Sequence, residues 1–182
     1  MGKSNSTYTI PLKSLSDGVH EYTYHLDDNF FAEIDSPEVQ KGEADAVVTV
    51  RRTGETFELH VTIEGRISIP CDRCLDDMEL PVETDDILYV KFGEEYSEES
   101  ENLIVVPESE GTIDLAWYIF ECIALTIPLM HTHAEGECNP EMAAILQSHS
   151  TYVVDDADAA PETDDECIDP RWEALKQLKE NK

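Results

Sequence analysis

The alternation of apolar and polar positions is clearest in the middle of the chain. Between residues 57 and 69, Phe, Leu, Val and Ile fall on odd positions, with Gly65 at the one gap. Strict period two over this length predicts a half-buried antiparallel strand. The run 46–52 is rich in β-branched residues, and Thr53-Gly54 supplies a turn, so the two runs predict a β-hairpin. We interpret Gly65 as a bulge or a bend in the second strand.

Further elements are predicted on both sides of this hairpin. Shorter apolar patterns predict strands over 8–12, 22–31, 87–92 and 103–106. From Ile113 to Ile127 the apolar spacing is helical, and Pro128 is expected to end that helix. Asn139 followed by Pro140 predicts the start of a short helix. The chain is therefore expected to be an α+β protein, with a mainly antiparallel sheet and one core helix.

The last third of the chain changes character. We expect the folded α+β domain to cover residues 7–148 and an acidic disordered linker to cover 149–169, because residues 150–169 hold eight acidic residues and no basic one. Residues 170–182 predict a short C-terminal helix with Trp172, Leu175 and Leu178 on one stripe. A short helix on a flexible tether is not stable alone in water, so we expect it to dock on its own domain or on a partner.

Charge excludes several classes of function. The chain has 182 residues and a formal net charge of −29, with 12 Lys and Arg against 41 Asp and Glu. This balance argues against a free-standing DNA or RNA binder, which needs clustered cations, and against binding an anionic membrane surface. A basic protein partner or a metal ion fits the field better. The N-terminus has no apolar signal-peptide core, and no stretch is long enough to span a membrane, so we expect a cytoplasmic protein.

A pair of cysteines carries the strongest chemical signal. Cys71 and Cys74 form a C-x-x-C directly after the long predicted strand, a spacing that lets both sulfurs reach one soft cation. Further candidate ligands stand in a polar loop at His133 and Cys138. Together the four residues would form a closed Cys3His site for structural Zn²⁺, with no position left open for catalysis. His131 is the alternative fourth ligand.

Other interpretations of the cysteines stay open. The pair could be a redox C-x-x-C, although the βαβ context of thioredoxin-like folds is missing, or two reduced thiols without a role. Cys122 is expected to be a small core residue of the predicted helix, and Cys167, in the acidic segment, to be incidental. Searches for nucleophile-elbow, phosphate-loop, dinucleotide-binding and zinc-protease motifs find nothing, so we expect no enzyme activity.

Three sequence runs together resemble the YceD family, the bacterial and plastid large ribosomal RNA subunit accumulation proteins. These runs are IPCDRCLDDMELPV, IDLAWYIFECIALTIPLMHTHAEGEC and DPRWEALKQLK, and they occur in the order of the family's motifs. The resemblance covers the chain from about Phe30 to its end. It matches Cys71 and Cys74 to the family's first cysteine pair, and His133 and Cys138 to the second cluster, which in some members is a C-x-x-C element.

The resemblance implies a process rather than a reaction. Such proteins are usually encoded near a large-subunit ribosomal protein gene and are implicated in the accumulation of 23S ribosomal RNA. We therefore expect a non-enzymatic ribosome-biogenesis factor that binds a basic large-subunit ribosomal protein or a precursor particle and contacts ribosomal RNA only indirectly. The alternative is a zinc- or redox-responsive regulatory protein that uses Cys71 and Cys74.

Overall fold

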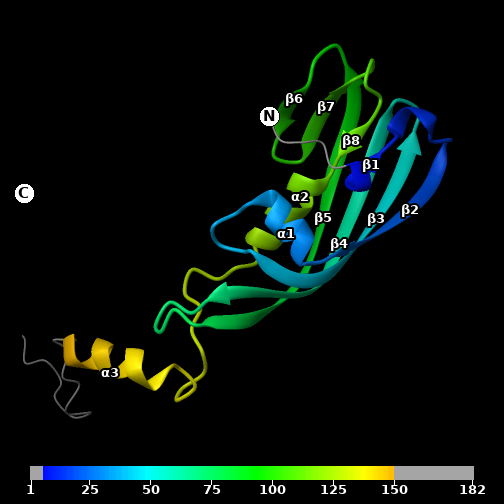
Figure 1. Ribbon diagram of the computed structural model, residues 1–182. Coiled ribbons are helices and arrows are strands. Elements are labelled where there is room, and N and C mark those ends of the chain that lie inside the picture. The colour runs from blue at the N-terminus through cyan, green and yellow to red at the C-terminus, as the bar shows by residue number, and fades with distance from the viewer. Residues whose placement is uncertain (1–5, 150–182) are drawn as a thin grey trace, which may run out of the picture. The chain divides into compact units, whose positions relative to one another are not determined.

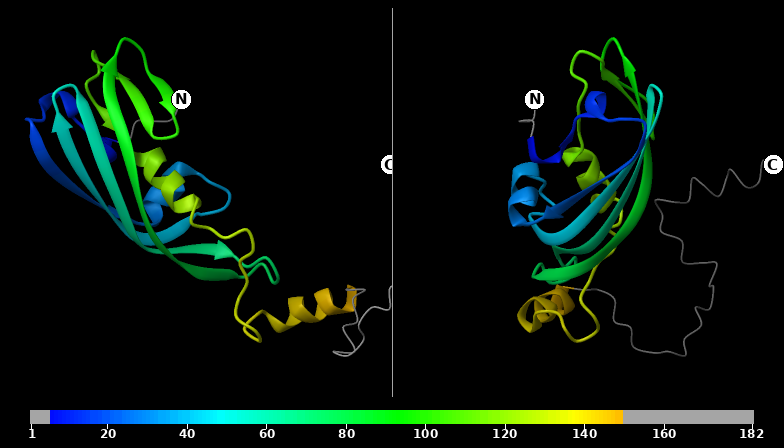
Figure 2. Two further views of the ribbon diagram at one scale, coloured as in Figure 1. Left: turned by 180° about the vertical axis from the view of Figure 1, so that it is seen from behind. Right: turned by 90° about the vertical axis from the view of Figure 1, so that its right-hand side faces the viewer.

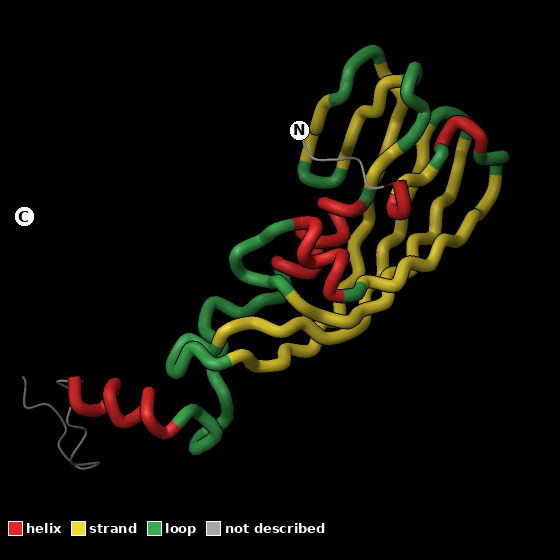
Figure 3. The backbone as a smooth tube through the Cα atoms, viewed as in Figure 1, coloured by secondary structure: helices red, strands yellow, loops and turns green. Residues whose placement is uncertain are grey.

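A computed structural model describes residues 6–149 of the chain (Figures 1 and 3). Residues 6–146 belong to one compact unit, built on a six-stranded sheet in the order β2-β3-β4-β5-β7-β6. The strands are β1 (Thr9–Ile10), β2 (Gly18–Leu26), β3 (Lys41–Thr53), β4 (Thr56–Pro70), β5 (Asp77–Gly93), β6 (Ser97–Ser100), β7 (Leu103–Pro107) and β8 (Ile113–Asp114). The α-helices are α1 (Asp28–Ile34), α2 (Ala116–Ala124) and α3 (Pro140–His149). This arrangement confirms the predicted α+β class.

The long hairpin predicted from the alternating pattern is present as β3 and β4. Its two strands pair from Thr53 opposite Thr56 to Lys41 opposite Ser68, and Gly54 in the turn has a φ of +65°. The sheet is antiparallel except between β5 and β7, which run parallel. The predicted strand at 87–92 is the second half of β5, which begins ten residues earlier, directly after the cysteine pair.

Gly65 marks a close approach between strands rather than a bulge. The pairing of β4 with both of its neighbours continues through Gly65 without a shift of register. A Cβ atom at this position would lie 2.4 Å from the Cα and Cβ atoms of Ala44 on β3. Non-bonded contacts this short do not occur, so only glycine lets the two strands meet here.

The core lies between the concave face of the sheet and two helices. Figure 2 shows α1 and α2 on the same side of the curved sheet. The apolar odd positions of β4, including Phe57, Leu59 and Ile63, are buried on this face, as the alternating pattern predicts. The strand predicted to run to Phe30-Phe31 ends instead at Leu26. Asp27 caps α1 by accepting hydrogen bonds from the backbone N–H groups of Asn29 and Phe30, and this cap places both phenylalanines in the core.

The core helix is shorter than the sequence predicts. The apolar residues from Ile113 follow helical spacing, yet Ile113 and Asp114 form β8, which pairs antiparallel with β1. Helix α2 begins at Ala116, whose N–H donates to the Asp114 side chain. The apolar pattern alone could not separate these two states, because a buried two-residue strand and a buried first helical turn present the same side chains.

Three further predictions concern the rest of the chain. Cys122 is 6% exposed on the buried face of α2, which confirms it as a core residue. Asn139 accepts hydrogen bonds from the backbone N–H groups of Glu141 and Met142, which confirms it as the cap of α3. The predicted acidic linker, apart from His149 at the end of α3, and the predicted C-terminal helix lie outside the described residues. Between residues 6 and 149, every helix is too short or too polar to cross a bilayer.

Candidate metal centre

The turn between β4 and β5 presents two sulfurs on one side. Cys71 follows the last residue of β4, and its N–H donates to the carbonyl of Asp76 across the turn at 2.9 Å. The N–H of Leu75 donates back to the carbonyl of Cys71, also at 2.9 Å. Leu75 closes the turn in the left-handed region, with φ of +63°. Both thiols are buried within this tight loop, with Cys71 at 0% and Cys74 at 1% exposure.

A second segment, residues 128–139, is hydrogen-bonded to the same turn. The N–H of Asp72 donates to the carbonyl of His131, and the N–H of His131 donates to the Asp72 side chain. Further along, the amide of Asn139 donates to the Asp76 side chain at 3.1 Å. The two carboxylates of the C-D-R-C-L-D turn therefore hold both ends of the segment that carries His133 and Cys138.

Four potential ligands meet where the two segments touch. One ligand atom from each of Cys71, Cys74, His133 and Cys138 lies within 4.8 Å of all the others. The Sγ atoms of Cys71 and Cys138 are 4.0 Å apart, and the Sγ atom of Cys74 is 3.4 Å from Nδ1 of His133. The structure thus brings together the four residues that the sequence analysis proposed as one site. His133 and Cys138 meet Cys71 and Cys74 although about sixty residues separate the two segments.

These separations fit a tetrahedral soft cation. Zinc binds thiolate sulfur at about 2.3 Å and imidazole nitrogen at about 2.0–2.1 Å, which places two sulfurs about 3.8 Å apart and a sulfur and a nitrogen about 3.6 Å apart. The observed values of 4.0 and 3.4 Å lie close to both. Three sulfurs and one nitrogen are also the donor set that favours zinc over harder ions. The residues present therefore fit Zn²⁺, and they occupy all four tetrahedral positions.

Backbone donors favour the charged form of one thiol. Burial raises the pKa of Cys71, but N–H groups of His133, Cys74 and Arg73 donate towards its sulfur and together lower its pKa to about 6. Hydrogen bonding to Cys71, and then to Cys74, raises the pKa of His133. Burial raises the pKa of Cys138, and the neighbouring sulfurs of Cys71 and Cys74 raise it further. A metal ion would need the deprotonated forms of His133 and Cys138, so its binding would release protons.

His131, the alternative fourth ligand, has other partners. Its Nε2 atom lies 3.4 Å from a carboxylate oxygen of Asp72, and its Nδ1 atom lies 3.2 Å from the carbonyl of Pro128. Both ring nitrogens are therefore directed to oxygen atoms. Asp72 and Asp76 were not identified as positioning residues from the sequence, because isolated carboxylates in an acidic chain carry no pattern that distinguishes them.

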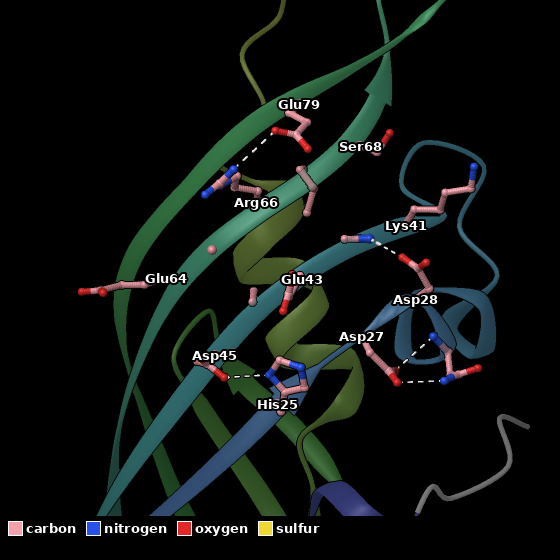
Figure 4. Close-up of a pocket in the computed structure, with 15 residues that line it drawn as sticks. His25, Asp27, Asp28, Lys41, Glu43, Asp45, Glu64, Arg66, Ser68 and Glu79 are labelled. Atoms are coloured by element: carbon pink, nitrogen blue, oxygen red, sulfur yellow. Dashed lines mark hydrogen bonds and ion pairs between the residues drawn. The ribbon is translucent and has the colours of Figure 1, made fainter.

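A second candidate site is a charged hollow on the sheet, shown in Figure 4. It has a volume of about 930 Å³ and lies beside the first turn of α1. Its charged lining is mostly acidic, with Asp27, Asp28, Glu43, Asp45, Glu64 and Glu79 against Lys41, Arg66 and His25. Ion pairs join His25 to Asp45 and Arg66 to Glu79 across neighbouring strands. This arrangement suits contact with a basic surface better than catalysis.

The fold and the site together define an α+β protein whose β4–β5 turn is closed by a Cys3His cluster. The sequence model of one family, described as large ribosomal RNA subunit accumulation protein YceD, matches residues 59–179. The chain belongs to this family. Comparison with curated proteins and with solved structures gave no match.

The matched region contains both halves of the cysteine cluster and the whole of α2. The family's description names the accumulation of large-subunit ribosomal RNA and names no reaction. The expectation drawn from the sequence resemblance is confirmed at this level.

Proposed function

We propose that this protein is a non-enzymatic ribosome-biogenesis factor that supports the accumulation or processing of 23S ribosomal RNA. It acts by binding a basic large-subunit ribosomal protein, alone or within a precursor particle, and its contact with RNA is indirect. The observation that carries the proposal is a row of unbalanced carboxylates on the solvent face of the sheet.

The row follows directly from the strand register. Asp45 on β3 lies opposite Glu64 on β4, and Glu64 lies opposite Glu83 on β5. All three side chains are exposed. Like charges directly opposite each other destabilise a sheet, and among residues 6–149 only His25, 2.9 Å from Asp45, forms an ion pair with a member of this row. Lysine and arginine side chains of a partner would remove the repulsion, so binding is favoured by relief of strain within the sheet as well as by attraction.

The Cys3His cluster supplies rigidity in this proposal. Cys71, Cys74, His133 and Cys138 would hold Zn²⁺, which as a structural ion fastens the β4–β5 turn to the 128–139 segment. Because its four positions are filled by protein, the ion would activate no water. Hydrogen bonds that the Asp72 and Asp76 carboxylates accept from His131 and Asn139 align the two segments without an ion.

The proposal is tested by sedimentation of lysates and by ribosomal RNA levels. We expect the protein to co-sediment with large-subunit precursors at low salt and to dissociate as salt rises, because exposed charges are screened. Nuclease treatment should leave it bound to isolated large-subunit proteins. Deleting the gene should lower 23S relative to 16S ribosomal RNA. Unchanged ribosomal RNA in the deletion strain would contradict the proposal.

A charge-matched pair of variants locates the contact. The triple variant Asp45→Asn, Glu64→Gln, Glu83→Gln should lose co-sedimentation and fail to restore 23S levels. The control variant Glu38→Gln, Glu55→Gln, Glu110→Gln removes the same charge from exposed positions outside the row and should behave as wild type. Equal loss in both variants would show that net charge alone, and not the sheet face, determines binding.

A second candidate function is a zinc- or redox-responsive regulator. The observation that favours it is the 4.0 Å separation between the Cys71 and Cys138 sulfurs, together with the pKa of Cys71 near 6, which keeps a reactive thiolate at neutral pH. Metal analysis of protein purified without chelator distinguishes the two functions. Protein that contains no zinc and forms a reversible disulfide within the cluster would favour the redox-responsive version of the regulator.

A further inference from the structure

Two large aromatic side chains lie on the surface near α2. Trp117, in the first turn of α2, is 56% exposed, and Tyr96, between β5 and β6, is 58% exposed. Aromatic side chains of this size are strongly enriched at protein interfaces, because they bury much apolar area while losing few rotatable bonds. Their exposure in the part of the chain that the structure describes calls for an explanation.

Each of the two aromatic side chains donates a hydrogen bond to a carboxylate. The indole Nε1 of Trp117 donates to Oε1 of Glu121, one helical turn later, at 2.5 Å. The hydroxyl of Tyr96 donates to Oε1 of Glu98 at 3.0 Å. On its buried side Trp117 packs on Phe120, with ring centroids 5.7 Å apart. Both rings are therefore held in place, and each presents a negative charge beside an aromatic surface.

The Tyr96–Glu98 pair and the Trp117–Glu121 pair interact electrostatically. Partial burial raises the pKa of Tyr96, and the charges of Glu98 and Glu121 raise it further. The Glu121 carboxylate on α2 therefore raises the pKa of the Tyr96 phenol, which precedes β6. Helix α2 and strand β6 lie next to each other in Figure 1 and in the left view of Figure 2. We call Tyr96, Glu98, Trp117 and Glu121 the aromatic patch. Its surroundings are acidic, with five glutamates between residues 94 and 101.

This combination matches the chemistry of a guanidinium group. Aromatic faces attract cations through the quadrupole of the ring, and arginine stacks on them more readily than the strongly hydrated ammonium of lysine. A neighbouring carboxylate can accept the guanidinium N–H groups in a bidentate pair. We propose that the aromatic patch is an arginine-binding surface that receives an arginine-containing segment of a basic partner protein. The proposal rests on the proposed function only for the class of partner and adds a second contact surface.

The test uses the purified full-length protein and a hexa-arginine peptide as the probe. The chain has two tryptophans, so Trp172→Phe leaves Trp117 as the only indole reporter. We expect calorimetry at low salt to detect binding, and the emission of Trp117 to change over the same concentration range. Hexalysine should bind more weakly, and higher salt should weaken both peptides.

Matched variants separate a specific site from general attraction. Glu121→Gln and Tyr96→Ala should each weaken binding of hexa-arginine by about fivefold, the usual contribution of an exposed cation–aromatic contact or charged pair. Glu55→Gln removes the same charge from an exposed position outside both the acidic row and the aromatic patch, and it should change the affinity by less than about twofold. All replaced side chains are exposed, so circular dichroism should be unchanged.

Three results would overturn the inference: no calorimetric binding at low salt, binding without a change in Trp117 emission, or equal weakening by Glu121→Gln and Glu55→Gln. These outcomes are independent of the proposed function. Ribosomal RNA levels can depend on the sheet face while the aromatic patch binds no peptide, and the reverse can also hold.

Discussion

The Nδ1 atom of His133 lies 3.4 Å from the Sγ atom of Cys74, although the two residues are 59 positions apart in the sequence. This contact joins the tip of a hairpin to a loop beyond the core helix. The 3.4 Å distance is close to the separation expected for a sulfur and a nitrogen that bind one tetrahedral zinc ion. The metal content of the purified protein is therefore the first property to measure.

Loss of one ligand should remove the metal and lower stability. We expect protein purified without chelator to contain one zinc per chain, and Cys74→Ser to contain none and to melt about 10 °C lower, because the binding energy of a structural ion is folding energy. Cys122→Ala serves as the control, since it removes a buried cysteine outside the cluster and should keep the metal. If Cys74→Ser had the melting curve of wild type, the cysteines would be thiols that bind no metal.

The thiols of the metal-free protein should differ in reactivity. Backbone N–H donors overcome the effect of burial and lower the pKa of Cys71 to about 6, whereas burial raises the pKa of Cys138. Above its pKa a thiol is a reactive thiolate, so alkylation of Cys71 by iodoacetamide should rise through about pH 6 and level off above it. Mass spectrometry of the modified peptides measures this. A rate of Cys71 alkylation that rises only at about pH 8.5, the ordinary value for a thiol, would contradict the assignment, and added zinc should protect both cysteines.

The cap of α1 should make part of the stability depend on pH. The Asn29 side chain and the backbone N–H of Phe30 donate to Asp27 and lower its pKa below the ordinary value of 3.8. Its contribution to stability is therefore present above pH 3.8 and lost as the pH falls through the lower, folded-state pKa. Asp27→Ala should lower the urea midpoint at neutral pH, and the difference from wild type should shrink as the pH falls through the folded-state pKa of Asp27.

Asp27→Asn is the matched control for this cap. Asparagine keeps a side-chain oxygen that can accept from the helix N-terminus, so it should stay close to wild type at neutral pH. If the difference in urea midpoint between wild type and Asp27→Ala did not depend on pH, ionisation of Asp27 would not contribute to stability.

The contact between Gly65 and Ala44 should tolerate no side chain. Gly65→Ala is expected to lower the free energy of unfolding by about 1–3 kcal/mol, because the added methyl group meets backbone atoms of β3 that cannot move aside. Thermal denaturation measures the change. Glu64→Ala, at the preceding exposed position, should have a much smaller effect, and equal melting temperatures for the two variants would contradict this explanation.

The sequence predicted those features that short-range patterns control. Strict alternation between residues 57 and 69 located β4 and its buried face, but the turn predicted at Thr53-Gly54 lies one residue later, at Gly54-Glu55. The observed turn places Asp45 opposite Glu64, whereas a two-residue turn at Thr53-Gly54 would place Asp45 opposite Thr62, so the acidic row depends on a register that the sequence did not predict. The C-x-x-C spacing similarly marked one half of the cluster, because a tight turn is a local structure.

Other features depend on contacts between distant segments. The first strand pairs with residues that look helical in isolation, so Ile113 and Asp114 could not be assigned without their partners Ile10 and Thr9. The choice of His133 over His131 as the fourth member of the cluster depends on where Asp72 and Pro128 direct the His131 ring. The proximity of Tyr96 to α2 likewise had no sequence signal, because β6 consists of exposed polar residues in an acidic stretch.

The pairing of β1 with β8 has a consequence for synthesis of the chain. Thr9 leaves the ribosome first and must wait until Asp114, 105 positions later (114 − 9), has followed before it can be hydrogen-bonded. Contacts this far apart slow folding and leave apolar side chains such as Ile10 and Leu12 without their native cover during translation. A prematurely terminated chain that ends before residue 113 would therefore be a preferred client of chaperones and proteases.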